Sequence, residues 1–192
     1  MILFINACAR KESRTRILAQ HLLNRLDAPF TELRLYEQKL PCVDQDFLAL
    51  RDRLTVEGNF EDPVFAYARQ FAAADTIVVA APYWDLSFPA ILKQYYEMVN
   101  AVGVTFAYSE QGIPVGLCHA ERLYYVTTAG GPMLLEEFGF GYIKALAENF
   151  YQIPETILIK AEGLDLQGAD VEAIMENAAH ETDLLFQKRD RH

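Results

Sequence analysis

Short apolar runs alternate with longer segments of helical spacing along this chain, and no other feature restricts its fold as strongly. Five runs have the length of buried strands and are bounded by polar residues, at 2–7, 30–35, 76–81, 123–128 and 156–161. Apolar residues at helical spacing occur between and after them, at 14–26, 63–74, 87–102 and 134–150, and beyond Asp170, a predicted N-cap. Five such units predict an α/β fold, a parallel sheet with helices on both faces.

The connections restrict the order of the strands as well. Right-handed crossovers leave few topologies, and the flavodoxin-like three-layer sandwich, with strand order 2-1-3-4-5, suits five parallel strands. We expect residues 1–192 to form one such domain. Residues 37–60 carry the weakest signal, a long connection with a short helix around 47–54. Ligands of such sheets bind beyond the carboxyl ends of strands one and three, so the loops after Ala7, Ala81 and Thr128 are the candidate site.

Composition excludes several classes of partner. The formal net charge of −10 repels a polyanion, which argues against nucleic acid. No apolar run approaches the roughly 18 residues that cross a bilayer, so we expect no membrane insertion. Three scattered cysteines, Cys8, Cys42 and Cys118, argue against a disulfide framework and against a metal site. With no export signal at the start of the chain, we expect a cytoplasmic protein.

The loop after the first predicted strand has a net charge opposite in sign to that of the whole chain. Residues 10–16 hold four basic side chains and one acidic one, a local net charge of +3. The loop runs into a helix, whose first N–H groups have no partner within the helix and favour an anion. Ser13 and Thr15 add hydroxyl donors, so the loop is typical of a phosphate site. Ser13 as a simple N-cap, with solvated Arg14 and Arg16, is the alternative.

The loop after the third predicted strand is rich in aromatic residues. It contains Trp84, the only tryptophan of the chain, between Tyr83 and Asp85. Aromatic side chains at a strand's carboxyl end suit a flat heteroaromatic ligand, and the Asp85 carboxylate accepts hydrogen bonds from a ring N–H. Alternatively, the rings pack against a helix and Asp85 belongs to a turn. Ser87 is a predicted cap of the helix that follows.

The loop after the fourth predicted strand contains two consecutive glycines, Gly130 and Gly131. Glycine lets the backbone approach a ligand closely, and consecutive N–H groups can point at one oxygen. A glycine pair followed by proline is also common in ordinary tight turns. The three loops together therefore carry more weight than this one does.

The stretch 80–117, AAPYWDLSFPAILKQYYEMVNAVGVTFAYSEQGIPVGL, and the later YYVTTAGGP resemble the flavodoxin-like NAD(P)H:quinone oxidoreductases and FMN-dependent azoreductases. The resemblance covers nearly the whole chain and is strongest over 75–131. It implies FMN as cofactor and NADH or NADPH as co-substrate. Hydride would pass through flavin N5 to a quinone or similar aromatic acceptor, which replaces the nicotinamide in a ping-pong cycle. It also implies a homodimer.

The resemblance assigns residues to the flavin but none to acid–base catalysis, because the flavin carries the chemistry. Three groups match the family: the phosphate turn, the segment along the isoalloxazine ring and the loop at the ring's other side. These are Ser13, Arg14 and Thr15; Tyr83, Trp84, Asp85 and Leu86; and Thr128, Ala129, Gly130 and Gly131. Azoreductases commonly have Met-Tyr-Asn-Phe where this chain has Tyr-Trp-Asp-Leu. Asp85 would accept a hydrogen bond from the flavin N3–H. Because of this difference in sequence, the resemblance does not extend to azo compounds as substrates.

Two other functions stay open. An electron-carrier flavodoxin would bind FMN without a nicotinamide reaction, although its phosphate loop is usually rich in Thr and Gly. A receiver-type signalling module needs an acidic cluster after strand one, where this chain has Asn6, Ala7 and Cys8, and a lysine near strand five, where Lys160 stands. The basic loop leaves a further alternative, since it suits either the FMN phosphate or a 2′-phosphate of NADPH.

Overall fold

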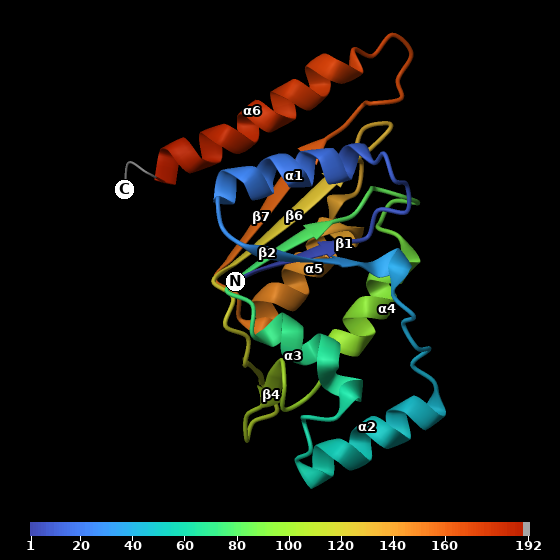
Figure 1. The fold of residues 1–192 in the computed structure, drawn as a ribbon, viewed down its shortest axis with the longest axis vertical. Helices are drawn as coiled ribbons and strands as arrows, with labels where there is room; N and C mark the ends of the chain where they lie inside the picture. The colour runs from blue at the N-terminus through green and yellow to red at the C-terminus, as the bar shows by residue number, and fades with distance from the viewer. Residues whose placement is uncertain (190–192) are drawn as a thin grey trace.

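The computed structural model describes residues 1–189 as a three-layer α/β sandwich around a five-stranded parallel sheet (Figure 1). The strand order is β2-β1-β3-β6-β7, which confirms the predicted order 2-1-3-4-5. The strands of this sheet are β1 (Ile2–Asn6), β2 (Phe30–Arg34), β3 (Thr76–Ala80), β6 (Arg122–Thr128) and β7 (Glu155–Ala161). Each lies within a residue or two of its predicted position, because each is a short apolar run with polar ends.

The helices divide between the two faces of the sheet. In Figure 1, α1 and α6 cover one face, and α3, α4 and α5 cover the other. The α-helices are α1 (Arg14–Leu26), α2 (Gln45–Glu57), α3 (Ala66–Ala72), α4 (Ala90–Val99), α5 (Phe140–Leu146) and α6 (Val171–Arg189); short 3₁₀ turns lie at Leu35–Glu37, Pro63–Phe65 and Glu136–Phe138. Asp170 caps α6 as predicted, since its carboxylate accepts from the Ala173 N–H at 3.0 Å. Within residues 1–189 no helix is both long and apolar enough to cross a membrane.

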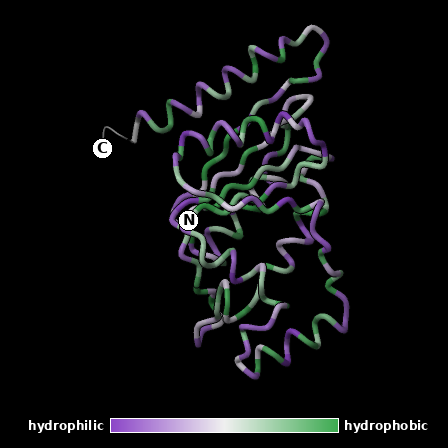
Figure 2. The backbone as a smooth tube through the Cα atoms, in the orientation of Figure 1, coloured by the Kyte–Doolittle hydropathy of each residue, from purple (hydrophilic) through white to green (hydrophobic). Residues whose placement is uncertain are grey.

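Two apolar clusters hold the layers together, one on each face of the sheet. Because side chains alternate along a strand, Phe4 of β1 packs with α1 and α6, while Leu3 and Ile5 pack with α3, α4 and α5. Figure 2 shows the hydrophobic residues gathered in the central strands, with the two kinds of residue alternating along the helices. Burial on both faces explains why β1 reads as a continuous apolar run.

Helix α4 is shorter than the predicted helix over 87–102. It begins at Ala90 after Pro89, and Ser87 does not cap it, because the Ser87 hydroxyl donates to the Phe138 carbonyl at 2.7 Å instead. Among its large apolar residues, Leu92, Tyr95, Tyr96 and Val99 are fully buried against its own sheet, and Ile91 is partly buried. The four fully buried residues therefore offer no surface to a second protomer.

The predicted helix over 134–150 is also interrupted. A 3₁₀ turn covers Glu136–Phe138, Gly139 adopts a non-helical backbone, and α5 begins only at Phe140. After Leu146 the helix widens into a π-helical turn at Ala147–Tyr151. The Ser87 bond to Phe138 joins the interrupted start to the loop after β3, so tertiary contact decides where this helix begins.

Helix α2 is longer than the short helix expected around 47–54. The Asp44 carboxylate accepts from the Phe47 N–H at 3.0 Å, and Gly58, with φ of 68°, ends the helix. Both residues lie within 37–60, the stretch whose apolar pattern was the weakest. In Figure 1, α2 lies away from the sheet. Arg51 attaches it by donating to the Glu97 carbonyl, at 3.0 Å, near the end of α4.

A small hairpin after α4 was not predicted. Its strands, β4 (Phe106–Tyr108) and β5 (Pro114–Gly116), pair antiparallel outside the main sheet. A side chain at Gly116 would overlap the backbone of Tyr151, so glycine is required for this close approach. The buried Thr105 hydroxyl donates to the Val99 carbonyl at 2.8 Å. Residues 103–108, GVTFAY, and Gly116 lie within the stretch that resembles the family, and these contacts give them structural roles after α4.

Candidate functional site

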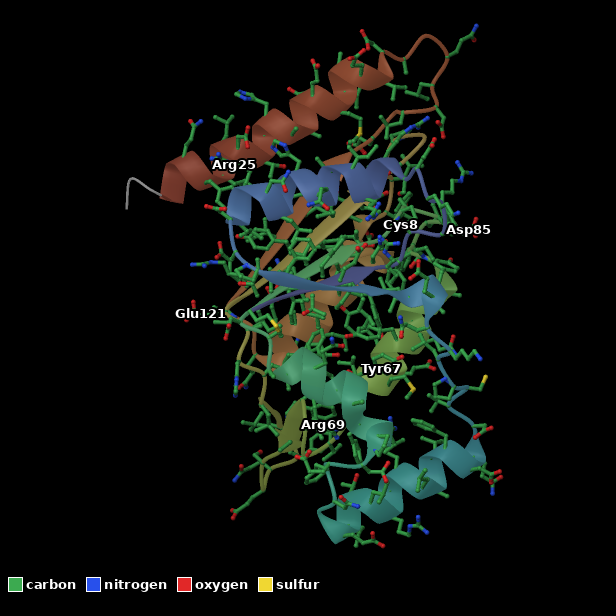
Figure 3. The ribbon with its side chains drawn as sticks, viewed as in Figure 1. Cys8, Arg25, Tyr67, Arg69, Asp85 and Glu121 are labelled. Atoms are coloured by element: carbon green, nitrogen blue, oxygen red, sulfur yellow. The ribbon has the colours of Figure 1, made fainter. Side chains whose placement is uncertain are left out.

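A cavity of about 280 Å³ opens at the carboxyl edge of the sheet, between the loops that follow β1, β3, β6 and β7. Eight of the eleven predicted site residues line it, together with six others. Those eight are Ser13, Arg14, Thr15, Tyr83, Trp84, Thr128, Ala129 and Gly130; the others are Ala9, Arg10, Glu12, Pro82, Leu164 and Asp165. Asp85, Leu86 and Gly131 are not part of this lining. Figure 3 shows Asp85 and Cys8 at the same edge of the molecule.

The loop after β1 brings the first turn of α1 to the cavity. Ser13 is the N-cap, and its hydroxyl accepts from the Arg16 N–H at 3.4 Å. The first N–H groups of a helix have no partner within the helix, and the macrodipole places positive charge there. Ser13 thus caps the helix, as the alternative interpretation of this loop held. The first turn of that helix still presents donors suited to a phosphate.

Two threonines join this loop to the end of β6. The Thr15 and Thr128 hydroxyls lie 2.6 Å apart in a hydrogen bond, and both residues are buried. Each hydroxyl is therefore engaged within the protein, and Thr15 is placed to offer a ligand its backbone N–H instead. The bond fixes the start of α1 relative to the loop that carries Gly130.

Arg14 contacts a residue that sequence reasoning missed. Its guanidinium lies 2.8 Å from the Asp165 carboxylate, in the loop after β7. Both side chains are substantially exposed, 42% and 69%, so water screens this pair. The signal that would have pointed to Asp165 is topological, because the fifth strand's carboxyl end lies at the same edge as the others.

The glycine loop is paired with that same β7 loop. Backbone N–H groups of Gly163, Leu164 and Asp165 donate to the carbonyls of residues 131, 129 and 130, at 3.1, 3.2 and 2.8 Å. A side chain at Gly130 would overlap the Asp165 carboxylate. A larger residue at position 130 would have to displace this exposed carboxylate, and the N–H groups of Gly130 and Gly131 are not used in these bonds.

The loop after β3 forms a strained turn. Trp84 and Ser87 exchange two backbone hydrogen bonds, of 3.0 and 2.8 Å, around Asp85 and Leu86, whose φ angles are 50° and 66°. Two positive φ angles between bonded residues define a type I′ turn. The left-handed region costs a non-glycine residue roughly 1–2 kcal/mol, and retained strain often marks a functional position. Asp85 does belong to a turn, as its alternative interpretation held.

The turn is held from two sides. The Tyr83 N–H donates to the Thr128 carbonyl at 3.0 Å, and the Tyr83 hydroxyl donates to the Leu135 carbonyl at 3.4 Å. The Ser87 bond to Phe138 attaches its other end. Trp84 and Leu86 remain 37% and 45% exposed, so Trp84 presents an apolar side chain at the cavity and Leu86 presents another in the same turn.

The titratable groups near the cavity offer no nucleophile. Burial raises the pKa of the Cys8 thiol to about 11, so Cys8 stays protonated and unreactive at neutral pH. Lys160 lies 2.5 Å from Glu136 and 3.3 Å from Glu162 and does not line the cavity. Among residues 1–189, no three His, Cys, Asp or Glu side chains gather as metal ligands would.

Comparisons with protein families and with known proteins point to the same group of relatives. A family model with a flavodoxin-like fold matches residues 1–184. An FMN-dependent NADH:quinone oxidoreductase 2 from Clostridium acetobutylicum is 36% identical over 188 residues, 92% of either chain. An FMN-dependent NADH:quinone oxidoreductase from Clostridium beijerinckii is 35% identical over 191 residues, covering 92% of this chain and 93% of that one.

Solved structures share the architecture. An azoreductase from Bacillus anthracis strain Sterne superposes with a TM-score of 0.81 at 24% identity, covering 97% of this chain and 98% of that chain. An FMN-dependent NADH-azoreductase from Bacillus anthracis strain Ames Ancestor, in complex with FMN, superposes with a TM-score of 0.80 at 22% identity over 97% of each chain. At these identities the likeness establishes the fold.

We predict that Thr15→Val lowers the free energy of unfolding by about 1–3 kcal/mol, because it leaves the buried Thr128 hydroxyl without its partner. The double variant Thr15→Val/Thr128→Val should recover most of that loss, since both polar groups are then removed together. Urea unfolding of the three proteins measures the effect. A single variant as stable as the parent would contradict the assigned bond.

Proposed function

The chain belongs to the flavodoxin-like fold family, among the FMN-dependent NADH:quinone oxidoreductases, and on that premise we propose that it transfers two electrons from NADH to a quinone or a similar aromatic acceptor through bound FMN. One observation carries the proposal beyond family membership. A basic helix N-terminus, an aromatic turn and a glycine loop, far apart in the sequence, line or flank one cavity.

The phosphate end of FMN fits the first turn of α1. Backbone N–H groups of Arg14 and Thr15 at the start of the helix supply donors, and the helix dipole favours the negative charge. Arg14 lies at the cavity within reach of the same turn, although Asp165 competes for its guanidinium. A phosphate would replace part of that exposed pair at little cost. We therefore assign Ser13, Arg14 and Thr15 to the phosphate.

The ring end of FMN fits between the strained turn and the glycine loop. When bound, FMN supplies hydride acceptance and donation. The protein would orient it: we assign Tyr83, Trp84, Asp85 and Leu86 to one side of the ring, and Thr128, Ala129, Gly130 and Gly131 to the other. The N–H groups of Gly130 and Gly131 would stabilise negative charge on the bound ring, and Trp84 and Leu86, which are exposed here, would shield it from water. No side chain is assigned as a general acid or base.

Apolar residues around the mouth of the cavity favour a homodimer. Trp84, Leu86, Leu134 and Phe138 are 37%, 45%, 75% and 56% exposed. The Ser87–Phe138 and Tyr83–Leu135 hydrogen bonds bring their two segments together into one patch. Large exposed apolar patches mark interaction sites. We propose that this patch is covered by a second copy of the chain, beside the acceptor space.

The compartment we propose is the cytoplasm. All three cysteines are free, and Cys42 is exposed. An exposed thiol persists in a reducing environment, where a nicotinamide co-substrate is also supplied.

The test of this function is the visible spectrum of the protein after incubation with FMN, followed by anaerobic NADH and then a benzoquinone. We expect a bound flavin spectrum, bleaching by NADH and return of the oxidised spectrum with quinone. Bound flavin that NADH does not bleach would favour the electron carrier. A protein that takes up no FMN would exclude the proposal.

We predict that Asp85→Gly weakens FMN binding roughly 10- to 100-fold, because it removes a charged acceptor for the flavin N3–H, worth about 1–3 kcal/mol. Glycine tolerates the positive φ of 50° at this position, so the turn itself survives. Asp85→Asn is the matched control, which keeps the turn and an amide oxygen and should lose less. FMN titration by fluorescence measures both, and unchanged affinity in Asp85→Gly would make Asp85 a turn residue only.

We predict a mass near twice 21.8 kDa in light scattering at micromolar concentration. Leu134→Glu, in the patch, should shift the protein toward the monomer, because it buries a charge in the interface. Val56→Glu is the control, since Val56 is 90% exposed on α2, outside the patch. A monomeric parent protein would end the dimer proposal.

A further inference from the structure

A second cavity, of about 350 Å³, lies on the other side of the loop after β1. It is lined by Asn6, Cys8, Ala9, Arg10, Lys11, Arg16, Arg34, Tyr36 and Glu37. It shares Ala9 and Arg10 with the first cavity, so a single stretch of loop separates the two. We propose that the second cavity binds the adenosine diphosphate half of the nicotinamide co-substrate, while the nicotinamide half reacts at the first. This inference rests on the proposed function.

The structure divides the basic loop between the two cavities. Arg14 faces the first, where it pairs with Asp165. Lys11 and Arg16 line the second, and Arg10 lines both. The positive charge in the sequence therefore exceeds what one FMN phosphate requires, and part of it is directed to a separate space.

The second cavity carries a net positive charge on a strongly acidic chain. Its lining holds Arg10, Lys11, Arg16 and Arg34 against the single carboxylate of Glu37, with Glu32 beneath them. Four cations against two carboxylates leave an excess of two positive charges, which matches a pyrophosphate dianion. In a molecule of net charge −10 such a region attracts an anion selectively.

Glu32 holds two of these arginines in place. Its carboxylate accepts from the Arg16 Nε at 3.3 Å and the Arg34 Nε at 3.2 Å, and the Asn6 amide donates to it at 2.8 Å. Burial alone would raise the pKa of the Glu32 carboxyl, but these hydrogen bonds outweigh burial and hold the pKa below its ordinary value. Both guanidinium groups are anchored through Nε, which leaves the Nη groups of Arg16 to a ligand.

Tyr36 supplies a surface for the adenine. It lies two residues after β2, in the 3₁₀ turn Leu35–Glu37, and is 48% exposed at the cavity. A half-exposed aromatic ring beside a cationic wall suits a purine that carries phosphates. Arg34 and Tyr36 thus present charge and ring from one short segment.

Sheet topology places this cavity where a dinucleotide needs it. β2 pairs with β1 in parallel, with Arg34 opposite Asn6, so the carboxyl end of β2 lies beside the loop after β1. If FMN takes the first cavity, the adenylate of the co-substrate has to lie outside it. The second cavity adjoins it across Ala9 and Arg10, which lets a pyrophosphate cross the loop.

The test compares two electron donors on the FMN-loaded enzyme. Reduced nicotinamide mononucleotide carries the reactive ring but lacks the adenylate. We expect Arg34→Ala and Tyr36→Ala to lower kcat/KM for NADH about tenfold or more and to leave kcat/KM for the mononucleotide and the affinity for FMN unchanged. Arg53→Ala on α2, whose partner Glu57 lies outside both cavities, is the matched control.

A binding measurement separates this site from the reaction. We expect ADP to bind the FMN-loaded protein in calorimetry, and Arg34→Ala to weaken it by a similar factor. Tighter binding of 2′,5′-ADP than of ADP would support the site and identify NADPH as the donor it favours. ADP binding that depends on Arg34 in a protein whose flavin no nicotinamide reduces would support the site while refuting the proposed function.

Two results would overturn the inference. One is an equal loss of activity with NADH and with the mononucleotide in the Arg34 variant. The other is the absence of binding of both ADP and 2′,5′-ADP to the parent protein at millimolar concentration.

Discussion

The parallel pairing of β1 with both β2 and β3 is the constraint on which the rest of the structure depends. It aligns Asn6 with Arg34 on one side and with Ala80 on the other. The carboxyl ends of parallel strands lie at one edge of the sheet. The loops that carry the candidate site residues therefore meet at that edge. The backbone bonds continue past the strands, from the Tyr83 N–H to the Thr128 carbonyl, so the loops inherit the register of the sheet.

Bonds between distant residues then make this edge rigid. Thr15 and Thr128 join the first and fourth βα units, and the β7 loop pairs with the glycine loop. The strain of Asp85 and Leu86 persists because backbone and side-chain bonds hold the turn on both sides. A site preorganised in this way orients a flavin without rearranging, which suits a reaction in which the cofactor supplies the reactivity.

The carboxyl edge of the sheet carries more basic side chains than one phosphate requires. The acidic chain repels anions generally, while the loop after β1 and the end of β2 attract them at one edge. Glu32 stays ionised among its donors and orients two arginines, and Asp165 partly neutralises Arg14 on the other side of the loop. The same edge therefore offers two anion environments, one beside the aromatic turn and one beside Tyr36.

The alternation of short apolar runs with segments of helical spacing was enough to predict the five strands, their order in the sheet and three of the loops at the site. A buried strand can be recognised in this way because its apolar residues are consecutive in the sequence. The length of α2 was also encoded, by Asp44 and Gly58, within a stretch whose apolar pattern was too weak to reveal it. The start of α4, the break before α5, the hairpin at 106–116 and the contacts of Asp165 were not predictable in this way. These depend on residues up to 151 positions apart, such as Arg14 and Asp165, whose proximity exists only once the sheet has brought the strand ends together.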